Sequence, residues 1–387
     1  MKEQIQNLSE EFFDEIVSVR RHLHMNPELS FEEYETSKYI KELLLSWKID
    51  YEDDFENNGI SVLIKGNSPD SRVLALRADF DALPIKEEND VIYKSRNEGV
   101  MHACGHDAHT SCLLGAIKIL NATKDLWEGT IKCIFQPAEE RLPGGAKQMI
   151  KDGVLENPSV QNIIAQHVLP DLEVGKVGFR PGIYMASTDE IYISVIGKGG
   201  HAAIPATYNN PLIASSELIL SLDEFFSKQE DSIFALGYVN GQGSTNVIPN
   251  EVELMGTFRA LNENFRKKSH IDINNIVNDI ARKYNLKIDL EIRKGYPSLH
   301  NDKDFTKNNI LKAKEYLGDD NVIDLPIRMT AEDFSYFANE RPSCFYRLGT
   351  GNKEKGITHG LHTSKFDIDE NSLKIGMGMM AFLAISS

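Results

Sequence analysis

Three histidines and a cysteine fall within nine consecutive residues, from Met101 to His109. The segment reads Met-His-Ala-Cys-Gly-His-Asp-Ala-His, so a thiol and several imidazoles stand close together in the chain. Thiolate and imidazole are common ligands of zinc, and imidazole also suits manganese. In an extended segment Cys104 and His106 would point to the same side, because side chains alternate along a strand. A solvated loop is the alternative interpretation, and partners elsewhere in the chain decide between the two.

Candidate metal ligands that could join Cys104 and His106 occur at the ends of two apolar strands and in a loop near the C-terminus. Glu139 and Glu140 come just after Pro137, His167 ends the next expected strand, and His362 lies in the loop. Ligands of open α/β sheets bind at the carboxyl ends of strands. One thiol, three histidines and one carboxylate are too many ligands for a tetrahedral zinc with an open position. They suit two ions about 3.5–4 Å apart that share a water, with one of the adjacent glutamates acting as general base.

Two further carboxylates end another expected strand. Asp79 and Asp81 stand shortly before Pro84. One interpretation is that they cap or form the turn there. The other is that they accept hydrogen bonds from ligand histidines and so orient those rings.

The elements that must position these residues alternate between helix and strand. Such alternation is typical of an α/β layer built on a buried, mainly parallel sheet flanked by helices. Apolar spacing predicts helices at 4–23, 32–48, 108–121 and about 370–385, and short aliphatic runs predict strands at 61–65, 72–77, 130–135 and 162–168.

The pattern changes between residues 185 and 295. Its order is β-α-β-β-α-β, which is the ferredoxin-like unit. We therefore predict an α/β catalytic domain made of residues 1–184 and 296–387, with a ferredoxin-like domain inserted at 185–295. The expected strands of the insert are 190–196, 233–239, 251–258 and 286–292, and its expected helices are 211–226 and 262–284.

The composition excludes several classes of function. The 387 residues include 42 Lys and Arg against 58 Asp and Glu, a net charge of −16. Such an acidic chain suits neither a nucleic-acid backbone nor an anionic membrane. No apolar run reaches the roughly 20 residues of a spanning helix, and the N-terminal segment lacks an apolar signal core. We expect a cytoplasmic protein with reduced thiols, whose Cys112, Cys133 and Cys344 lie in the core.

Six segments, taken in order, resemble one family, the amidohydrolase branch of the aminoacylase and carboxypeptidase dinuclear metallopeptidases. Hippurate hydrolase, the plant auxin-conjugate hydrolases and N-acetyldiaminopimelate deacetylase belong to it. Any one segment is a weak signal, but six in the same order are highly specific, and the resemblance covers nearly the whole chain. They are Arg-His-Leu-His-Met-Asn-Pro-Glu (21–28), Arg-Ala-Asp-Phe-Asp-Ala-Leu-Pro (77–84), His-Ala-Cys-Gly-His-Asp-Ala-His (102–109), Gln-Pro-Ala-Glu-Glu (136–140), Gly-Gly-His-Ala-Ala (199–203) and Asn-Val-Ile-Pro (246–249).

The resemblance implies a metal-dependent hydrolase with two divalent ions per subunit, zinc or manganese. Glu139 matches the general base of the family. The remaining histidines near the motifs, His22, His24 and His109, are expected to support the fold rather than bind metal. The metal ligands of the family match Cys104, His106, Glu140, His167 and His362.

The inserted domain resembles a lid that often joins two subunits into a homodimer. His201 matches a histidine that stabilises the transition state, often from the partner subunit, and Asn246 and Arg259 match positions around the substrate carboxylate. Without the resemblance, His201 would be interpreted as a surface histidine in a turn. Arg259 would be interpreted as a charged residue on an edge strand. One departure concerns Ala206 and Asn210, which stand where relatives carry a histidine and an acid. Because of these two substitutions, the contacts of the lid with substrate and with a partner subunit cannot be carried over from the relatives.

The expected activity is hydrolysis of N-acyl amino acids, carrying acetyl, benzoyl or similar groups, to a carboxylic acid and an amino acid. A dipeptidase or carboxypeptidase of the same family is the alternative, because only the substrate pocket differs. A nucleophilic Cys104 is a second chemical route. An inactive metal-binding scaffold is the non-enzyme alternative, although such a protein is expected to lack the base or a ligand. Glu332 and Asp333 are expected to cap a short helix, with a role facing the metals as the alternative.

Overall fold

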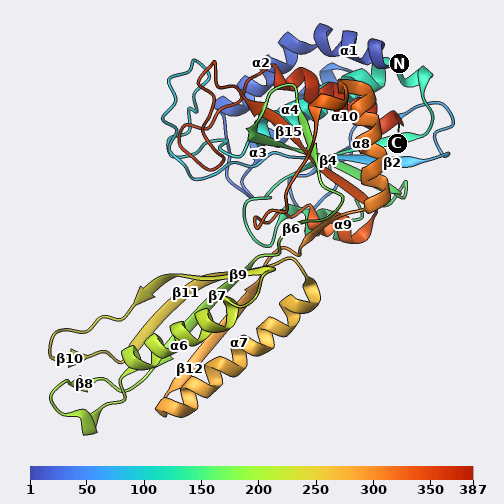
Figure 1. Cartoon of the computed structure of the whole chain (residues 1–387). Coiled ribbons are helices and arrows are strands. Elements are labelled where there is room, and N and C mark those ends of the chain that lie inside the picture. The colour runs from blue at the N-terminus through green and yellow to red at the C-terminus, as the bar shows by residue number, and fades with distance from the viewer. Residues whose placement is uncertain (387) are drawn as a thin grey trace. The chain divides into compact units, whose positions relative to one another are not determined.

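The computed structural model describes residues 1–386, which divide into two compact units (Figure 1). The first comprises residues 1–182, 300–326 and the chain from Asp333 onward. The second comprises residues 183–299 and 327–332. The boundaries expected from the pattern, after 184 and after 295, therefore differ from these by two and four residues. Nothing in the sequence indicated that residues 327–332 would belong to the second unit.

The first unit is built on a mixed seven-stranded sheet with the order β1-β3-β2-β4-β15-β5-β14. Its central pairs, β3 with β2, β2 with β4 and β4 with β15, are all parallel. The α/β class predicted from the sequence is confirmed. The strands are β1 (Ile60–Lys65), β2 (Val73–Asp79), β3 (Thr130–Gln136), β4 (Asn162–Glu173), β5 (Val177–Phe179), β14 (Val322–Asp324) and β15 (Ser343–Gly351).

Helices surround this sheet, and the helix expected at 4–23 is two helices that meet at Phe12. The irregularity is slight, since the Phe12 amide still bonds to the Leu8 carbonyl. No helix among the described residues is long and apolar enough to cross a membrane. The helices of the unit are α1 (Lys2–Glu11), α2 (Phe13–Met25), α3 (Tyr34–Ser46), α4 (His106–Ala122), α5 (Gly145–Lys151), α8 (Lys303–Leu317), α9 (Ser335–Glu340) and α10 (Ser372–Ser386).

Helices α4 and α10 form the centre of the apolar core. Both are buried along most of their length, which is typical of a helix that is apolar all round. Glycines bring them close together: a Cβ on Gly115 would lie 2.6 Å from Met377 Sδ, and one on Gly376 2.4 Å from Cys112 Sγ. Cys112, Cys133 and Cys344 are fully buried, as predicted. This packing holds α4, whose first residue is His106, firmly in the unit.

The second unit contains a four-stranded antiparallel sheet with the order β12-β7-β11-β9. Helices α6 and α7 lie side by side on one face of it (Figure 1). Strand β7 alternates buried and half-buried residues, as expected for a sheet covered on one face. The elements are β7 (Asp189–Ile196), α6 (Pro211–Phe226), β9 (Ser232–Asn240), β11 (Glu251–Ala260), α7 (Glu263–Tyr284) and β12 (Lys287–Lys294), with the small pair β8 (Gly200–His201) and β10 (Val247–Ile248). Strands β6 (Gly182–Met185) and β13 (Leu299–Asn301) occur where the chain passes between the units.

Candidate metal centre

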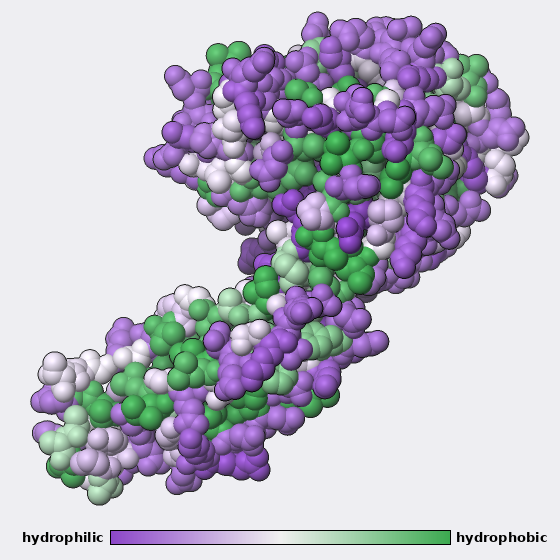
Figure 2. Space-filling model, in the orientation of Figure 1, coloured by the Kyte–Doolittle hydropathy of each residue, from purple (hydrophilic) through white to green (hydrophobic). Residues whose placement is uncertain are grey.

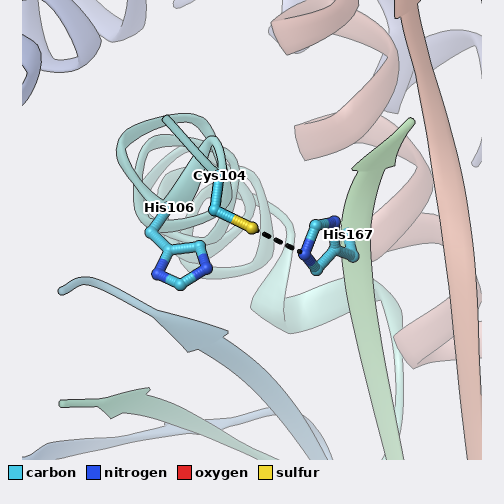
Figure 3. A group of neighbouring side chains, drawn as sticks. All are labelled: Cys104, His106 and His167. Carbon is cyan, nitrogen blue, oxygen red and sulfur yellow. Dashed lines mark hydrogen bonds between the residues drawn. The ribbon is translucent and has the colours of Figure 1, made fainter. Parts of the chain in front are cut away.

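Cys104 and His106 stand at the start of α4, not in an extended segment. Between them Gly105 adopts the left-handed conformation with φ +82°, which glycine reaches without strain. A side chain there would also collide, because a Cβ on Gly105 would lie 2.5 Å from Val168 Cγ2. The expectation of an extended stretch is wrong. The turn at Gly105 brings the two side chains together instead, as Figure 3 shows.

His167 lies within β4, two residues beyond the last pairing of β4 with β2, at Ala165. It was expected at the end of this strand, but β4 continues to Glu173 alongside β15. The His167 Nδ1–H donates to the carbonyl oxygen of Val168 at 2.8 Å. The other nitrogen, Nε2, therefore presents its lone pair and lies 3.5 Å from Cys104 Sγ (Figure 3).

Glu140 and His362 complete the group. His362 Nε2 lies 3.3 Å from Cys104 Sγ and 3.3 Å from Glu140 Oε1, and His106 Nε2 lies 3.8 Å from the same oxygen. His362 adopts φ +60°, unusual for a residue other than glycine, and its amide donates to the Ala103 carbonyl. The five side chains matched to metal ligands thus form one connected cluster.

Two buried atoms of this cluster have no hydrogen-bond partner, His106 Nε2 and Glu140 Oε1. An orphaned buried acceptor costs about 1–3 kcal/mol, so two that face each other call for a cation or a donor between them. Burial, and then Glu140 and Glu139, raise the pKa of Cys104 well above its ordinary value. A thiolate at this position therefore needs a neighbouring cation. The donor set fits divalent metal ions.

Asp81 contacts two residues of the cluster at once, one through its side chain and one through its backbone. Its carboxylate accepts from His106 Nδ1 at 3.1 Å, from the Glu140 backbone N–H at 2.9 Å and from Ser30 Oγ at 2.6 Å. Burial opposes the ionisation of Asp81, but the hydrogen bond and charge of His106, together with the hydrogen bonds from Ser30 and the Glu140 amide, outweigh burial and lower its pKa. With Nδ1 of His106 engaged, its Nε2 is the ring nitrogen left to face a metal ion.

Asp79 lies on the other side of His106. It accepts from His109 Nδ1 at 2.6 Å and from Arg77 Nη1 at 2.7 Å. Burial disfavours its charge, but Arg77 and the histidines outweigh burial and hold its pKa well below the usual range. His109 uses its second nitrogen to accept from the Val168 amide. Although His109 lies near His106 and Asp79, both of its ring nitrogens are engaged in hydrogen bonds, which agrees with the expectation that it supports the fold.

The expectation that His24 supports the fold agrees with its contacts. Its Nδ1 lies 2.7 Å from Asp107 and its Nε2 lies 3.3 Å from Glu87. Arg20, which is fully buried, donates to the same Asp107 oxygen at 2.8 Å. This network anchors the residue that follows His106 to α2.

Glu139 lies beside the cluster, with a carboxylate oxygen near a ring nitrogen of His106 and near a carboxylate oxygen of Glu140. It is 6% exposed and accepts from the Asp333 backbone N–H at 3.4 Å. The residue before it, Ala138, adopts φ +54°. The adjacent glutamates thus reach different partners, with only Glu140 close to His362.

Three residues of this region were missed or misread in the sequence. Glu33 accepts from the Ala138 amide at 2.7 Å, a contact with no local signal. Glu332 and Asp333 were expected to cap α9, with a role facing the metals as the alternative, but α9 has no side-chain cap and both carboxylates lie near Glu139. The Asp333 carboxylate instead accepts from the Ala146 amide, in the first turn of α5, at 3.0 Å.

In the second unit, His201 and Asn246 lie in and next to the small β8–β10 pair, which precedes β11 in the chain, whereas Arg259 lies near the end of β11. His201 in β8 is exposed, accepts from the Ala203 amide through Nδ1, and pairs with Val247, next to Asn246. Arg259 lies near the end of β11, half-buried, and donates to the Met329 carbonyl at 3.2 Å. Strand β11 has 10 residues, and at about 3.4 Å per residue it separates the two groups by roughly 30 Å.

A family model described as "Peptidase family M20/M25/M40" matches residues 75–386. Thermostable carboxypeptidase 2 of Saccharolobus solfataricus is 37% identical over 393 residues, covering 99% of this chain and 98% of that protein. N-acetyl-L-cysteine deacetylase of Bacillus subtilis is 36% identical over 363 residues, covering 93% of this chain and 85% of that protein. The crystal structure of Bacillus subtilis YXEP protein, described as a dinuclear metal-binding peptidase from the M20 family, superimposes with a TM-score of 0.84 at 32% identity, covering 97% and 98% of the two chains.

Proposed function

Because the chain belongs to peptidase family M20/M25/M40, we propose that it is a metal-dependent amidohydrolase that cleaves N-acyl amino acids to a carboxylic acid and an amino acid. One observation carries this proposal. Five ligand-type side chains form a connected cluster, and a sixth group, the Glu139 carboxylate, lies beside it. That arrangement is what hydrolysis by an activated water requires.

The cluster would hold two divalent ions, zinc or manganese. Cys104, His106, Glu140, His167 and His362 would hold them, in keeping with the orphaned atoms of His106 and Glu140. The similarity to the dinuclear metal-binding peptidase of Bacillus subtilis supports two ions rather than one. Bound ions of this kind polarise a carbonyl and lower the pKa of a water at the site to about 7.

The residues of the chain would supply the proton transfers and the orientation. Glu139 would take a proton from the attacking water and then deliver it to the leaving amine. Asp81 would keep the His106 ring and the Glu140 backbone in place through its two hydrogen bonds. Arg259 would bind the carboxylate of the amino acid, since a planar guanidinium matches a carboxylate.

We favour N-acyl amino acids as substrates because a deacetylase is among the relatives. A carboxypeptidase at similar identity keeps a carboxypeptidase or dipeptidase as the second candidate. A panel of N-acetyl, benzoyl and indoleacetyl amino acids against dipeptides would distinguish them. Glu139→Gln should retain metal and lose about 10²–10⁴ in turnover. Wild-type turnover in this variant would refute the role of Glu139, and an intact metal-loaded chain inactive on the whole panel would favour a scaffold.

The second unit would act as a lid that joins two chains into a homodimer. A substrate bound by Arg259 could not reach His201 or Asn246 of the same second unit, because β11 separates them by roughly 30 Å. A partner subunit that supplies His201 and Asn246 would resolve this. We therefore assign stabilisation of the transition state to His201 of the partner subunit.

The two edges of the four-stranded sheet differ in a way that supports this dimer. Edge strand β12 carries exposed ion pairs, Lys287 with Asp289 and Arg293 with Glu291, which discourage pairing with another chain. Figure 2 shows apolar residues gathered over α6 in the same unit. Edge strand β9 and the adjacent helix expose large apolar side chains, namely Ile233, Tyr238 and Val239 on β9 and Leu212, Ile213 and Leu220 on α6.

Mixing two inactive variants would test the shared site. In a heterodimer of His201→Ala with Glu139→Gln, one site would keep its own Glu139 and receive His201 from the other chain. Statistical mixing should then restore about one quarter of wild-type activity. If His201 acts within its own chain, the mixture would stay inactive. Sedimentation of the wild-type chain as a monomer would refute the dimer.

A further inference from the structure

Asp333 is a fully buried carboxylate that accepts hydrogen bonds from three donors and lies near the carboxylates of Glu139 and Glu332. It accepts from Arg77 Nη2 at 2.9 Å, from Gln136 Nε2 at 2.8 Å and from the Ala146 amide at 3.0 Å. Its own backbone N–H donates to Glu139 Oε1 at 3.4 Å. One residue thus contacts the carboxylate of the proposed base through its main chain and several anchors through its side chain.

The anchors of Asp333 lie at both ends of the loop that carries the glutamate pair. Gln136 is the last residue of β3, and Ala146 lies in the first turn of α5. Within this loop the Gly145 amide bonds to the Ala138 carbonyl at 2.9 Å, so the two ends are also tied to each other. A single carboxylate therefore fixes the start and the finish of the segment that presents Glu139.

Arg77 connects the same carboxylate to the metal side of the site. Its guanidinium donates to Asp333 and, through Nη1, to Asp79 at 2.7 Å. Arg77 is fully buried, as are both of these acids. Buried charges require such pairing, so the positions of Asp79 and Asp333 are coupled through one rigid, planar group.

We propose that Asp333 is a positioning residue that holds the Glu139 carboxylate in place for proton transfer, by clamping the 136–146 loop and by its backbone N–H. This rests on the proposed function, since it requires Glu139 to be the base. Asp333 does not touch the substrate or the cluster ligands in this role. It acts through the geometry of Glu139.

The chemistry of the site makes Asp333→Asn a sharp test. The amide NH2 would face one of the surrounding donors, and the loop would have to move to relieve that contact. Misplacing a reacting group by about 1 Å costs about 10²-fold in rate. We therefore expect kcat of Asp333→Asn to fall by about 10²-fold, with KM and the bound metal per chain unchanged.

A double-mutant cycle with Glu139→Gln separates positioning from general damage. If Asp333 acts through Glu139, adding Asp333→Asn to the Glu139→Gln enzyme should lower kcat no further. Equal losses in both backgrounds would overturn the proposal, as would wild-type kcat in the single variant or a loss of metal from it. Wild-type turnover of Glu139→Gln alone would instead refute the proposed function.

Two further variants separate an effect on catalysis from a general loss of stability. Asp189→Asn is a matched control, because Asp189 is also buried and accepts from Arg266 at 2.5 Å and from His270 at 2.6 Å, but in the second unit. It should lower Tm and leave kcat unchanged. If Asp333→Asn does not fold, Gln136→Met removes one anchor and keeps Asp333. It should give a smaller kcat loss that also disappears in the Glu139→Gln background, and an additive loss would overturn the proposal.

Discussion

Replacing Asp81 is expected to weaken metal binding more than folding. In Asp81→Ala the His106 ring and the Glu140 backbone lose their shared acceptor, at distances of 3.1 and 2.9 Å in the intact chain. Loss of such an orienting group costs 10- to 100-fold in metal affinity, which is about 1.4–2.7 kcal/mol. Each buried donor left unsatisfied adds about 1–3 kcal/mol of lost stability.

The measurement is a titration of metal-stripped protein with zinc in the presence of a competing chelator, beside a urea unfolding curve. Asp81→Asn should lie between wild type and Asp81→Ala, since its oxygen can still accept from His106 while its NH2 cannot accept from Glu140. Ser30→Ala is the matched control, because it removes the third donor, at 2.6 Å, and spares both ligands. Wild-type zinc affinity in Asp81→Ala, or an equal loss in Ser30→Ala, would refute the reasoning.

Three further outcomes follow from the structure. Burial, and then Asp81, raise the pKa of Glu33 to about 8, whereas the unfolded chain releases this proton near 4.3. Stability to urea should therefore fall as pH rises from about 4.3 to 8, and Glu33→Gln should flatten that slope; an unchanged slope would contradict it. Gly105→Ala should lower both Tm and zinc affinity, because φ is +82° and the new Cβ would meet Val168; calorimetry with wild-type values would argue against the turn. Arg259→Lys should raise KM for N-acyl amino acids but not for their amides, and an equal rise for both would count against carboxylate binding.

Local patterns predicted the elements well because periodicity and turn residues are local properties. The helix at 211–226 was predicted with the bounds it has, and the strand at 130–135 ends one residue later in the structure. The exceptions arise from tertiary contacts. β4 continues past His167 because β15 pairs with it as far as Glu173, which the sequence of β4 alone could not indicate.

The candidate ligands were predictable because their side-chain types are rare and their spacing is short. The residues that hold these ligands in place were harder to predict. Glu33 reaches Ala138 across 105 positions, and Asp333 reaches Ala146 across 187. Each is an ordinary acid in its own neighbourhood, so only the folded chain reveals what it contacts.

The close packing of α4 against α10 sets an order of events during synthesis. His362 meets Cys104 across 258 positions, and Met377 meets Gly115 across a similar span. The residues of the second unit end at 332, so we expect it to fold while β15 and α10 are still being made, because domains generally fold as units during synthesis. Before β15 and α10 have been made, the core of the first unit that positions Cys104 and the histidines is incomplete. We therefore expect metal loading to come late, because the cluster is complete only once His362 has been made and reaches Cys104.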